Sequence, residues 1–343
     1  MSIWNIENKD VFFEQVLKMN EDKVRLAIGD GKKEYYKNIV EIPKKNGKRQ
    51  IYIVDNKNDL YKLQKNLCTN FLENIMISDV AYGFVKNNSY VDYLYPHVNF
   101  YKKNNYLRLD IKDFFGSINY EILKSTISYY FNNDMSIEEK ELLIEYTLEI
   151  LTYEKLVVQG AVTSPVISNI VFRELDIRIL RYCRKYGIKY TRYADDLLFS
   201  SDNTRIFNDV FILGISKILK SKSFNINYNK IIRSKQEISL GGYVVSDNIR
   251  LSRKKLSNIN RVLFYLENNT YENKEDFFEQ MNLIIQRQGM DRIIKGHYEL
   301  LNFLAGYRSF IISILKYSED TTFINKSKKI IKRIENIILK IDI

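Results

Sequence analysis

The sequence predicts an α+β fold, because helical and strand patterns alternate along a single chain of 343 residues. Stretches with apolar residues three and four positions apart are interrupted by short runs rich in valine, isoleucine, tyrosine and phenylalanine, a composition typical of strands. Hydrophobic residues make up 45% of the chain and charged residues 28%, which indicates a globular protein with a sizeable core. Only three prolines and thirteen glycines are present, which argues against long disordered linkers.

The charge and the aromatic content indicate a polyanionic partner. The formal net charge is +11 and the isoelectric point is about 9.2, and such an excess of lysine and arginine is typical of proteins that bind nucleic acid. Aromatic residues make up 13% of the chain, including 26 tyrosines, and their rings can stack on bases. Taken alone, the charge is equally consistent with a solubilising surface.

The cysteine count and the lack of targeting segments indicate a reducing compartment. Cys68 and Cys183 lie in apolar helical contexts, which predicts buried thiols and no disulfide framework. Two histidines and two cysteines are too few for a typical zinc site. The sequence shows no signal peptide, and no apolar run reaches the ~18 residues of a membrane span. We therefore expect a cytoplasmic protein with no membrane partner.

The first 105 residues are expected to form helices and one basic hairpin. Residues 1–40 carry apolar residues at helical spacing. Strands are predicted at 39–43 and 50–54, and the turn between them ends in Lys48 and Arg49. Cations at the tip of a hairpin suit a triphosphate, because arginine binds phosphate oxygens in pairs. A solvated basic turn is the alternative.

Two further segments complete this region. The apolar spacing of 57–76 predicts an amphipathic helix. Aromatic residues are frequent at 90–101, a segment that contains His97. A lone histidine is more often structural than catalytic, so we assign it no chemistry.

A strand predicted at 106–111 presents the first carboxylate of interest, Asp110. An aromatic turn begins at Asp113 and leads to a helix at 120–131. The Asp113 side chain either caps this helix or lies near a ligand, because backbone N–H groups at a helix start bind phosphate oxygens.

Helices continue through the middle of the chain. Ser136 and Glu139 fit a capping box at the start of a helix that runs to about Leu151. After Gln159 and a glycine, a helix of about twenty residues is predicted at 166–186, with a proline in its permitted first turn.

The stretch from Tyr190 to Ser200 is the most informative part of the sequence. Two adjacent carboxylates, Asp195 and Asp196, lie between β-favouring flanks, which predicts the tip of a hairpin. Burying two unpaired carboxylates side by side is costly, and a divalent cation relieves their repulsion. Together with Asp110 on a second strand, they can hold two Mg²⁺ ions about 4 Å apart for in-line phosphoryl transfer.

The remainder of the chain is expected to be mainly helical. A helix at about 203–220 precedes a strand at 224–230 that ends in Lys230, and a glycine-containing hairpin follows at 240–245. A helical bundle is then predicted from four segments with apolar residues at helical spacing: 256–266, 277–294, 297–317 and 325–341.

Three boxes, taken in order, resemble those of reverse transcriptases. Tyr193-Ala194-Asp195-Asp196 is similar to their catalytic box, and the run from Asp110 to Phe115 is similar to the preceding metal box. The run from Gln159 to Pro165 is similar to a box with Gln-Gly at its start and Ser-Pro at its end. Their order and spacing fit the bacterial, retron-type branch, and the resemblance extends from about residue 44 to 243.

The resemblance implies a right-hand polymerase, an α+β fold with an antiparallel sheet and helices in its palm. N-terminal helices and fingers would occupy 1–105. The palm would occupy 106–250, with fingers elements at about 120–165. A helical, nucleic-acid-binding thumb would occupy 251–343.

The resemblance also implies individual roles around the metal site. Asp110, Asp195 and Asp196 would hold two Mg²⁺ ions, and Lys230 would lie near the phosphates and protonate the leaving pyrophosphate, unless it is a plain surface lysine. Phe115 would exclude a 2′-hydroxyl, unless it is a plain core residue. The residues that would contact the incoming nucleotide are Lys48, Arg49, Asp113, Phe114, Phe115 and Gln159.

Two further surfaces would contact nucleic acid. Gly241, Gly242 and Tyr243 resemble the primer grip, where glycine lets the backbone approach the primer closely. A basic stripe on the last helix would bind phosphates or be a solvated helix face, and it consists of Lys328, Lys329, Lys332 and Arg333.

The function implied is that of a retron-type RNA-directed DNA polymerase in antiphage defence. Its partners would be a structured non-coding RNA that serves as template and primer, dNTPs, the DNA product, and an effector or toxin protein. Two departures from the retron pattern keep a second branch open. Of an Asn-Ala-x-x-His box only His97 remains, and Leu240-Gly241-Gly242 replaces Val-Thr-Gly.

That second branch consists of abortive-infection and other defence-associated reverse transcriptases, which make untemplated or differently templated DNA. An RNA-binding scaffold with a vestigial polymerase site is an alternative of another class. All three carboxylates and Gln159 are present, which argues against it.

Overall fold

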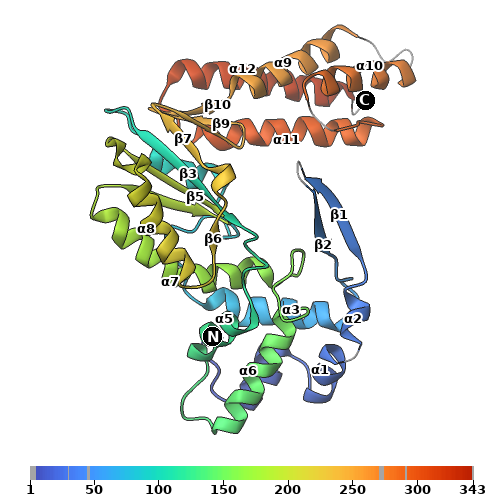
Figure 1. The fold of residues 1–343 in the computed structure, drawn as a ribbon. Coiled ribbons are helices and arrows are strands. Elements are labelled where there is room, and N and C mark those ends of the chain that lie inside the picture. Colours follow the sequence, from blue (N-terminus) through green and yellow to red (C-terminus); the bar gives the residue numbers. More distant parts are fainter. Residues whose placement is uncertain (1–4, 30, 45–46, 270–273, 290–291, 342–343) are drawn as a thin grey trace. The chain divides into compact units, whose positions relative to one another are not determined.

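The computed structural model describes residues 5–29, 31–44, 47–269, 274–289 and 292–341 (Figure 1). By internal contacts the chain divides into two compact units. The first comprises Met1–Asn88, Leu107–Phe199 and Arg205–Ile232, and the second comprises Ser89–Tyr106, Ser200–Thr204 and Arg233–Ile343. Among the helices of these described ranges, none combines the length and apolar character that a membrane crossing requires.

The N-terminal part of the first unit consists of helices and a two-stranded hairpin. A π-helical segment, Val11–Leu17, precedes α1 (Glu21–Ile28) and α2 (Lys32–Tyr35). The predicted hairpin is present as β1 (Ile39–Lys44) and β2 (Gly47–Tyr52), which pair antiparallel. Residues 45 and 46 of its predicted turn lie outside the described residues.

Three helices of the first unit lie where the sequence predicts them. They are α3 (Asp59–Asn70), α5 (Tyr120–Ile127) and α6 (Ile137–Leu151). Helices α3 and α5 end earlier than predicted and are followed by 3₁₀ turns. The Ser136 side chain accepts a hydrogen bond from the Glu139 backbone N–H at 3.1 Å, so the predicted start of α6 is confirmed. α5 is capped by Asn119, whose side chain accepts from the Ile122 backbone N–H at 3.0 Å. The alternative in which Asp113 caps this helix is therefore wrong, because Asn119 is adjacent to the first turn.

A five-stranded sheet carries the carboxylates. Its order is β4-β5-β3-β6, and β7 also pairs with β3. The strands are β3 (Asn105–Lys112), β4 (Lys189–Tyr193), β5 (Asp196–Ser201), β6 (Asn225–Ile226) and β7 (Ile232–Lys235). Helices α7 (Ser164–Arg184) and α8 (Asp209–Lys220) pack against it, as Figure 1 shows.

The predicted strand at 224–230 is shorter than expected. Only Asn225–Ile226 pairs with β3, and Tyr228–Lys230 forms a 3₁₀ turn. The backbone N–H of Asn227 donates to the Asp110 carbonyl at 2.8 Å, and the backbone N–H of Lys230 then donates to the Asn227 carbonyl at 3.0 Å. The chain thus leaves the sheet immediately beside Asp110.

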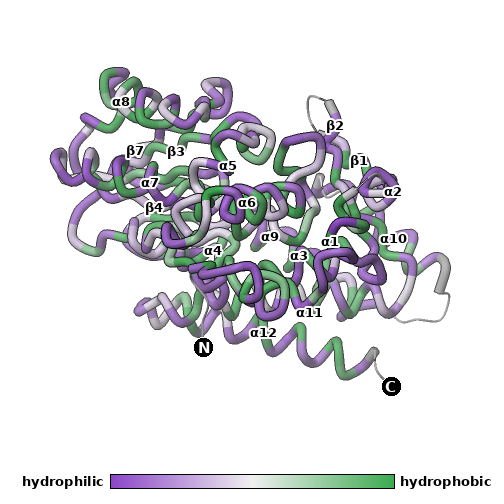
Figure 2. The backbone as a smooth tube through the Cα atoms, turned by 90° about the horizontal axis from the view of Figure 1, so that it is seen from below, coloured by the Kyte–Doolittle hydropathy of each residue, from purple (hydrophilic) through white to green (hydrophobic). Residues whose placement is uncertain are grey.

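The second unit contains a small sheet and a helical bundle. Helix α4 (Tyr90–Leu94) precedes a three-stranded antiparallel sheet of β8 (Ile238–Leu240), β9 (Tyr243–Val245) and β10 (Ile249–Leu251). The bundle consists of α9 (Arg253–Asn268), α10 (Lys274–Arg287), α11 (His297–Leu315) and α12 (Thr321–Ile341). In Figure 2, hydrophilic and hydrophobic positions alternate along α12, as an amphipathic helix requires.

Candidate active site

Three carboxylates meet at the centre of the sheet. Asp110 lies on β3, Asp195 in the turn between β4 and β5, and Asp196 at the start of β5, and one oxygen of each lies within 4.8 Å of those of the other two. The backbone N–H of Ile111 donates to the Asp195 carbonyl at 3.0 Å, which ties β3 to the turn. The separate strands therefore bring together the carboxylates that the sequence predicts as one site.

The turn that carries Asp195 is tightly enclosed. Ala194 has a φ of +53°, a left-handed conformation that is uncommon for alanine. A Cβ atom at Gly83 would lie 2.4 Å from the Ala194 backbone nitrogen, so only glycine lets this neighbouring loop approach. Since strained backbone persists only where its surroundings hold it, the packing under the turn is part of the site.

A buried ion pair lies beneath this turn. The Arg192 and Asp176 side chains are both 0% exposed, and the guanidinium donates to both carboxylate oxygens, at 2.8 Å and 3.0 Å. Arg192 also donates to the Ala194 carbonyl at 3.2 Å and to the Asn169 side chain at 3.0 Å. Asn169 in turn donates to the Gly83 carbonyl at 2.9 Å. This network connects α7, the turn and the Gly83 loop.

Burial dominates the electrostatics of the carboxylates. It raises the pKa of Asp196 to about 6, against the opposing effect of the Arg108 guanidinium. It also raises the pKa of Asp195, and the charge of Asp110 acts in the same direction. Arg108 and Lys230 are the cations in contact with the cluster among the described residues, and the Lys230 ammonium donates to Asp110 Oδ2 at 3.1 Å.

The residues present fit a divalent metal. Asp110 is 2% exposed, and its Oδ1 atom has no hydrogen-bond partner in the described part of the chain. A buried carboxylate oxygen without a donor is unfavourable, and a hard cation satisfies it, since Mg²⁺ prefers carboxylate oxygens. Asp110, Asp195 and Asp196 are the group that could hold such an ion among the residues that the structure describes.

The aromatic turn after β3 is compact. Phe114 is buried, and Phe115 is partly exposed and contacts both Phe114 and Phe84, with ring centroids 5.4 Å and 5.9 Å apart. Asp113 is exposed, with a φ of +45°. Phe115 therefore packs against the core and remains partly exposed.

Gln159 and the basic hairpin are connected through β2. The Tyr52 backbone N–H donates to the Gln159 carbonyl at 2.8 Å. Gly160 has a φ of +103°, and a Cβ atom there would lie 2.2 Å from the Tyr52 carbonyl oxygen. Lys48 and Arg49 are exposed on β2, and Lys48 forms an ion pair with Glu41 at 2.5 Å. The close approach at Gly160 fixes Gln159 against the strand that carries both cations.

The segment that resembles the primer grip lies in the second unit. Gly241 and Gly242 have φ values of +58° and +91°, so the glycines meet a requirement of the turn between β8 and β9. Tyr243 is buried, and its ring stacks on Phe310 with centroids 4.2 Å apart. The turn's backbone is thereby held in place by α11.

The basic stripe of α12 divides into exposed and engaged residues. Lys328, Lys329 and Lys332 lie on the helix surface. Arg333 donates to both carboxylate oxygens of Glu267 at 2.8 Å and to the Asn260 side chain at 2.9 Å, which joins α12 to α9. The structure therefore gives Arg333 a role in packing the bundle.

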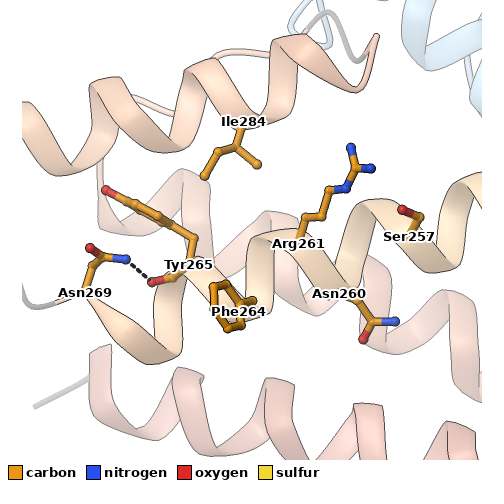
Figure 3. Close-up of a pocket in the computed structure, with 7 residues that line it drawn as sticks. All are labelled: Ser257, Asn260, Arg261, Phe264, Tyr265, Asn269 and Ile284. Carbon is orange, nitrogen blue, oxygen red and sulfur yellow. Dashed lines mark hydrogen bonds between the residues drawn. The ribbon is translucent and has the colours of Figure 1, made fainter.

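A hollow of about 610 Å³ lies along α9 and α10 (Figure 3). The exposed ring of Phe264 and the Arg261 side chain belong to its wall, and none of the described residues that line it is acidic. These residues are Ser257, Asn260, Arg261, Phe264, Tyr265, Asn269 and Ile284.

Several residues of the site were not predicted from the sequence. Arg108, Asn169, Asp176 and Arg192 all belong to the contacts of the carboxylates or of their turn. Arg108 was discoverable, because a cation inside an apolar strand needs a buried partner. His97 is 0% exposed, and its Nδ1 lies 2.7 Å from the Ser200 hydroxyl. The structure places it in the core.

Comparisons with known proteins agree with this geometry. Residues 42–245 match a family model described as reverse transcriptase (RNA-dependent DNA polymerase). The retron Mx65 reverse transcriptase of Myxococcus xanthus is 28% identical over 235 residues, which cover 65% of this chain and 54% of that protein. The retron Ec86 reverse transcriptase of Escherichia coli is 28% identical over 226 residues, which cover 64% of this chain and 66% of that protein.

Among solved structures, an apo telomerase from Candida tropicalis is similar with a TM-score of 0.46 and 14% identity, over 89% of this chain and 65% of that chain. The match to the two curated relatives spans between about half and two thirds of their length. The predicted resemblance to retron-type reverse transcriptases and the predicted α+β class are confirmed.

Proposed function

Because this chain belongs to the reverse transcriptase family, we propose that it is an RNA-directed DNA polymerase of the retron type. It extends a primer 3′-hydroxyl with dNTPs by copying an RNA template. The observation that carries the proposal is the meeting of Asp110, Asp195 and Asp196, with oxygens within 4.8 Å, where the family boxes converge.

The carboxylates would bind two Mg²⁺ ions, which supply charge stabilisation for in-line phosphoryl transfer. In this proposal Asp110 and Asp195 are the principal ligands, and Asp196 is a secondary ligand or orients the pair. Lys230, 55% exposed and in contact with Asp110, can turn towards the leaving pyrophosphate and act as its general acid.

Nucleotide selection would depend on the fingers and the aromatic turn. Phe115, which is partly exposed, would exclude a 2′-hydroxyl and so favour dNTPs over rNTPs. Lys48 and Arg49 would bind the triphosphate, the backbone at Asp113 and Phe114 would donate to phosphate oxygens, and Gln159 would contact the nucleotide.

The second unit would bind nucleic acid. The turn of Gly241, Gly242 and Tyr243 would hold the primer, and Lys328, Lys329 and Lys332 would contact phosphates. We add the hollow along α9 and α10 to this surface, because an exposed aromatic ring beside an arginine suits a nucleobase and its phosphate. Arg333 would contribute least to this surface, because its guanidinium is paired with Glu267.

We place this activity in the cytoplasm, in antiphage defence, with a structured non-coding RNA as template and primer and an effector or toxin protein as partner. The similarity to retron enzymes supports these proposed details. The replacement of Val-Thr-Gly by Leu240-Gly241-Gly242, together with the loss of Asn-Ala before His97, favours a second candidate. This candidate is a defence-associated reverse transcriptase of the abortive-infection type, with untemplated or differently templated DNA as its product.

The proposal is tested with the double variant Asp195→Asn, Asp196→Asn. The purified protein with its co-purified RNA should incorporate dNTPs in the presence of Mg²⁺, and the double variant should lose this incorporation while it retains RNA binding. Undiminished incorporation by the variant would refute the two-metal site. Sequencing of the co-purified nucleic acid separates the candidates, because DNA joined to a structured RNA identifies a retron and untemplated or repetitive DNA identifies the second branch.

A further inference from the structure

Arg108 lies inside the carboxylate cluster. It precedes Asp110 by two residues on β3, so both side chains leave the strand on the same face. Its guanidinium donates to Asp110 Oδ2 at 3.2 Å and forms a closer contact with Asp196 Oδ1 on β5. The exposed fractions of the three side chains are 17% for Arg108, 3% for Asp110 and 19% for Asp196. The cation therefore joins two strands at a site with little access to water.

The two cations of the cluster differ in how firmly they are held. Lys230 is 55% exposed and reaches Asp110 with a single ammonium group. Arg108 is mostly buried, and one guanidinium nitrogen, Nη2, contacts carboxylates from two strands. Three carboxylates and these two cations leave one net negative charge on the cluster, and Arg108 is the fixed part of that compensation.

We propose that Arg108 is a positioning residue of the polymerase site, an inference that rests on the proposed two-metal function. Its guanidinium holds Asp110 and Asp196 together against their mutual repulsion before a metal binds. It also keeps an oxygen of Asp196 turned towards β3. The unpartnered Asp110 Oδ1 and the Asp195 carboxylate then remain as the oxygens that receive the metal.

This arrangement has two separable effects. The positive charge of Arg108 repels an incoming divalent cation, so it lowers the metal affinity of the free protein. The Nη2 group, which is shared between Asp110 and Asp196, orients the Asp196 carboxylate, so it supports the rate of the chemical step. Lysine preserves the charge without the planar guanidinium and its placement of Nη2, and glutamine removes both, which allows the two effects to be measured independently.

The experiment compares the wild type with Arg108→Gln and Arg108→Lys. Mn²⁺ serves as the probe, and its binding to the free protein, without nucleotide, is followed by electron paramagnetic resonance. Incorporation of dNTPs is measured at saturating Mg²⁺. The matched control is Arg178→Gln, which removes an arginine on α7 that is partly exposed and paired with Glu174 and Ser221. Circular dichroism establishes that each variant is folded.

We expect Arg108→Gln to bind Mn²⁺ on the order of tenfold more tightly than the wild type and to lose on the order of tenfold in kcat. Arg108→Lys should retain a Mn²⁺ affinity within about threefold of the wild type, yet show a similar loss of kcat. The control should match the wild type in both measurements.

The inference is overturned if Arg108→Gln leaves the Mn²⁺ affinity unchanged, even when its melting temperature falls, because a merely structural arginine gives that result. It is also overturned if Arg108→Lys restores full kcat. Failure of the proposed function gives a different set of results. In that case the wild type binds no Mn²⁺, and the double variant of Asp195 and Asp196 still incorporates dNTPs. The inference about Arg108 is then refuted as well.

Discussion

Replacement of Asp176 by asparagine should destabilise the first unit strongly. The substitution keeps the shape of the side chain but removes the charge that compensates Arg192, which is 0% exposed. In the wild type, Asp176 accepts hydrogen bonds from Arg192 and from the Tyr190 hydroxyl, the latter at 2.8 Å. The amide can accept on one atom only, so one of its N–H groups faces the guanidinium.

The expected loss follows from the completeness of the burial. Removing one partner of a buried ion pair typically costs about 3–5 kcal/mol, because the other charge is left uncompensated in a low-dielectric interior. Arg192 retains its bonds to the Ala194 carbonyl and the Asn169 side chain, and it also lies over the Phe172 ring at 4.4 Å. These contacts compensate part of the charge, so we expect about 3 kcal/mol, the lower end of the range.

A double-mutant cycle of Asp176→Asn and Arg192→Met measures this coupling. Urea unfolding followed by circular dichroism and by a second probe gives the free energies, provided that the transitions coincide. Because the methionine side chain carries no charge, the second substitution should restore at least about 2 kcal/mol relative to additivity. Free energies that add to within about 0.5 kcal/mol would refute the reasoning, since contacting charges in one network cannot be independent.

Three further outcomes are expected. The folded-state pKa of Asp196 is raised to about 6, so the metal-free protein should lose stability as the pH rises through this value. Relative to Asp196→Asn in EDTA, the loss in unfolding free energy between about pH 4 and pH 7 should be about 2 kcal/mol, and parallel pH profiles would contradict it. Phe115→Ala should raise rNTP incorporation relative to dNTP incorporation by at least about tenfold; competition assays measure this ratio, which a purely structural Phe115 would leave unchanged. Joint replacement of Lys328, Lys329 and Lys332 by glutamine should reduce the slope of log affinity for RNA against log salt by about 2, whereas an unaltered slope in filter-binding titrations would place the phosphates elsewhere.

The parts of the site that the sequence predicted correctly are those fixed by neighbouring residues. The hairpin around Asp195 and Asp196 follows from β-favouring flanks on either side of a polar pair. The adjacent glycines at 241 and 242 predict a tight turn, and both adopt the left-handed backbone conformation in it. The pairing of β1 with β2 depends on a short turn in the same way. In each case the residues that predict the structural feature lie next to it in the sequence.

The contacts that could not be predicted from the sequence join residues that are far apart along the chain. Arg108 contacts Asp196 across 88 positions, and Arg192 contacts Asp176 across 16. These pairs depend on which strands are neighbours and on how α7 packs, and neither is encoded by local spacing. The failure at 224–230 has the same origin, because the hydrogen bond from Asn227 to the Asp110 carbonyl redirects a segment whose composition alone favours a strand.

Arg192 and Arg108, the two arginines of the sheet in contact with carboxylates, have different roles in this account. The difference follows from the exposed fractions of their ion pairs. Arg192 and its partner are both 0% exposed, so no ion from solvent can replace either of them, and the pair supports the turn permanently. Arg108 and Asp196 are 17% and 19% exposed, and the Asp196 carboxylate that Arg108 contacts is also a candidate metal ligand. Arg192→Met should therefore lower the unfolding free energy without tightening Mn²⁺ binding, and Arg108→Gln should tighten it. A tighter Mn²⁺ site in Arg192→Met would mean that charge anywhere near the turn, and not contact with the carboxylates, controls metal affinity.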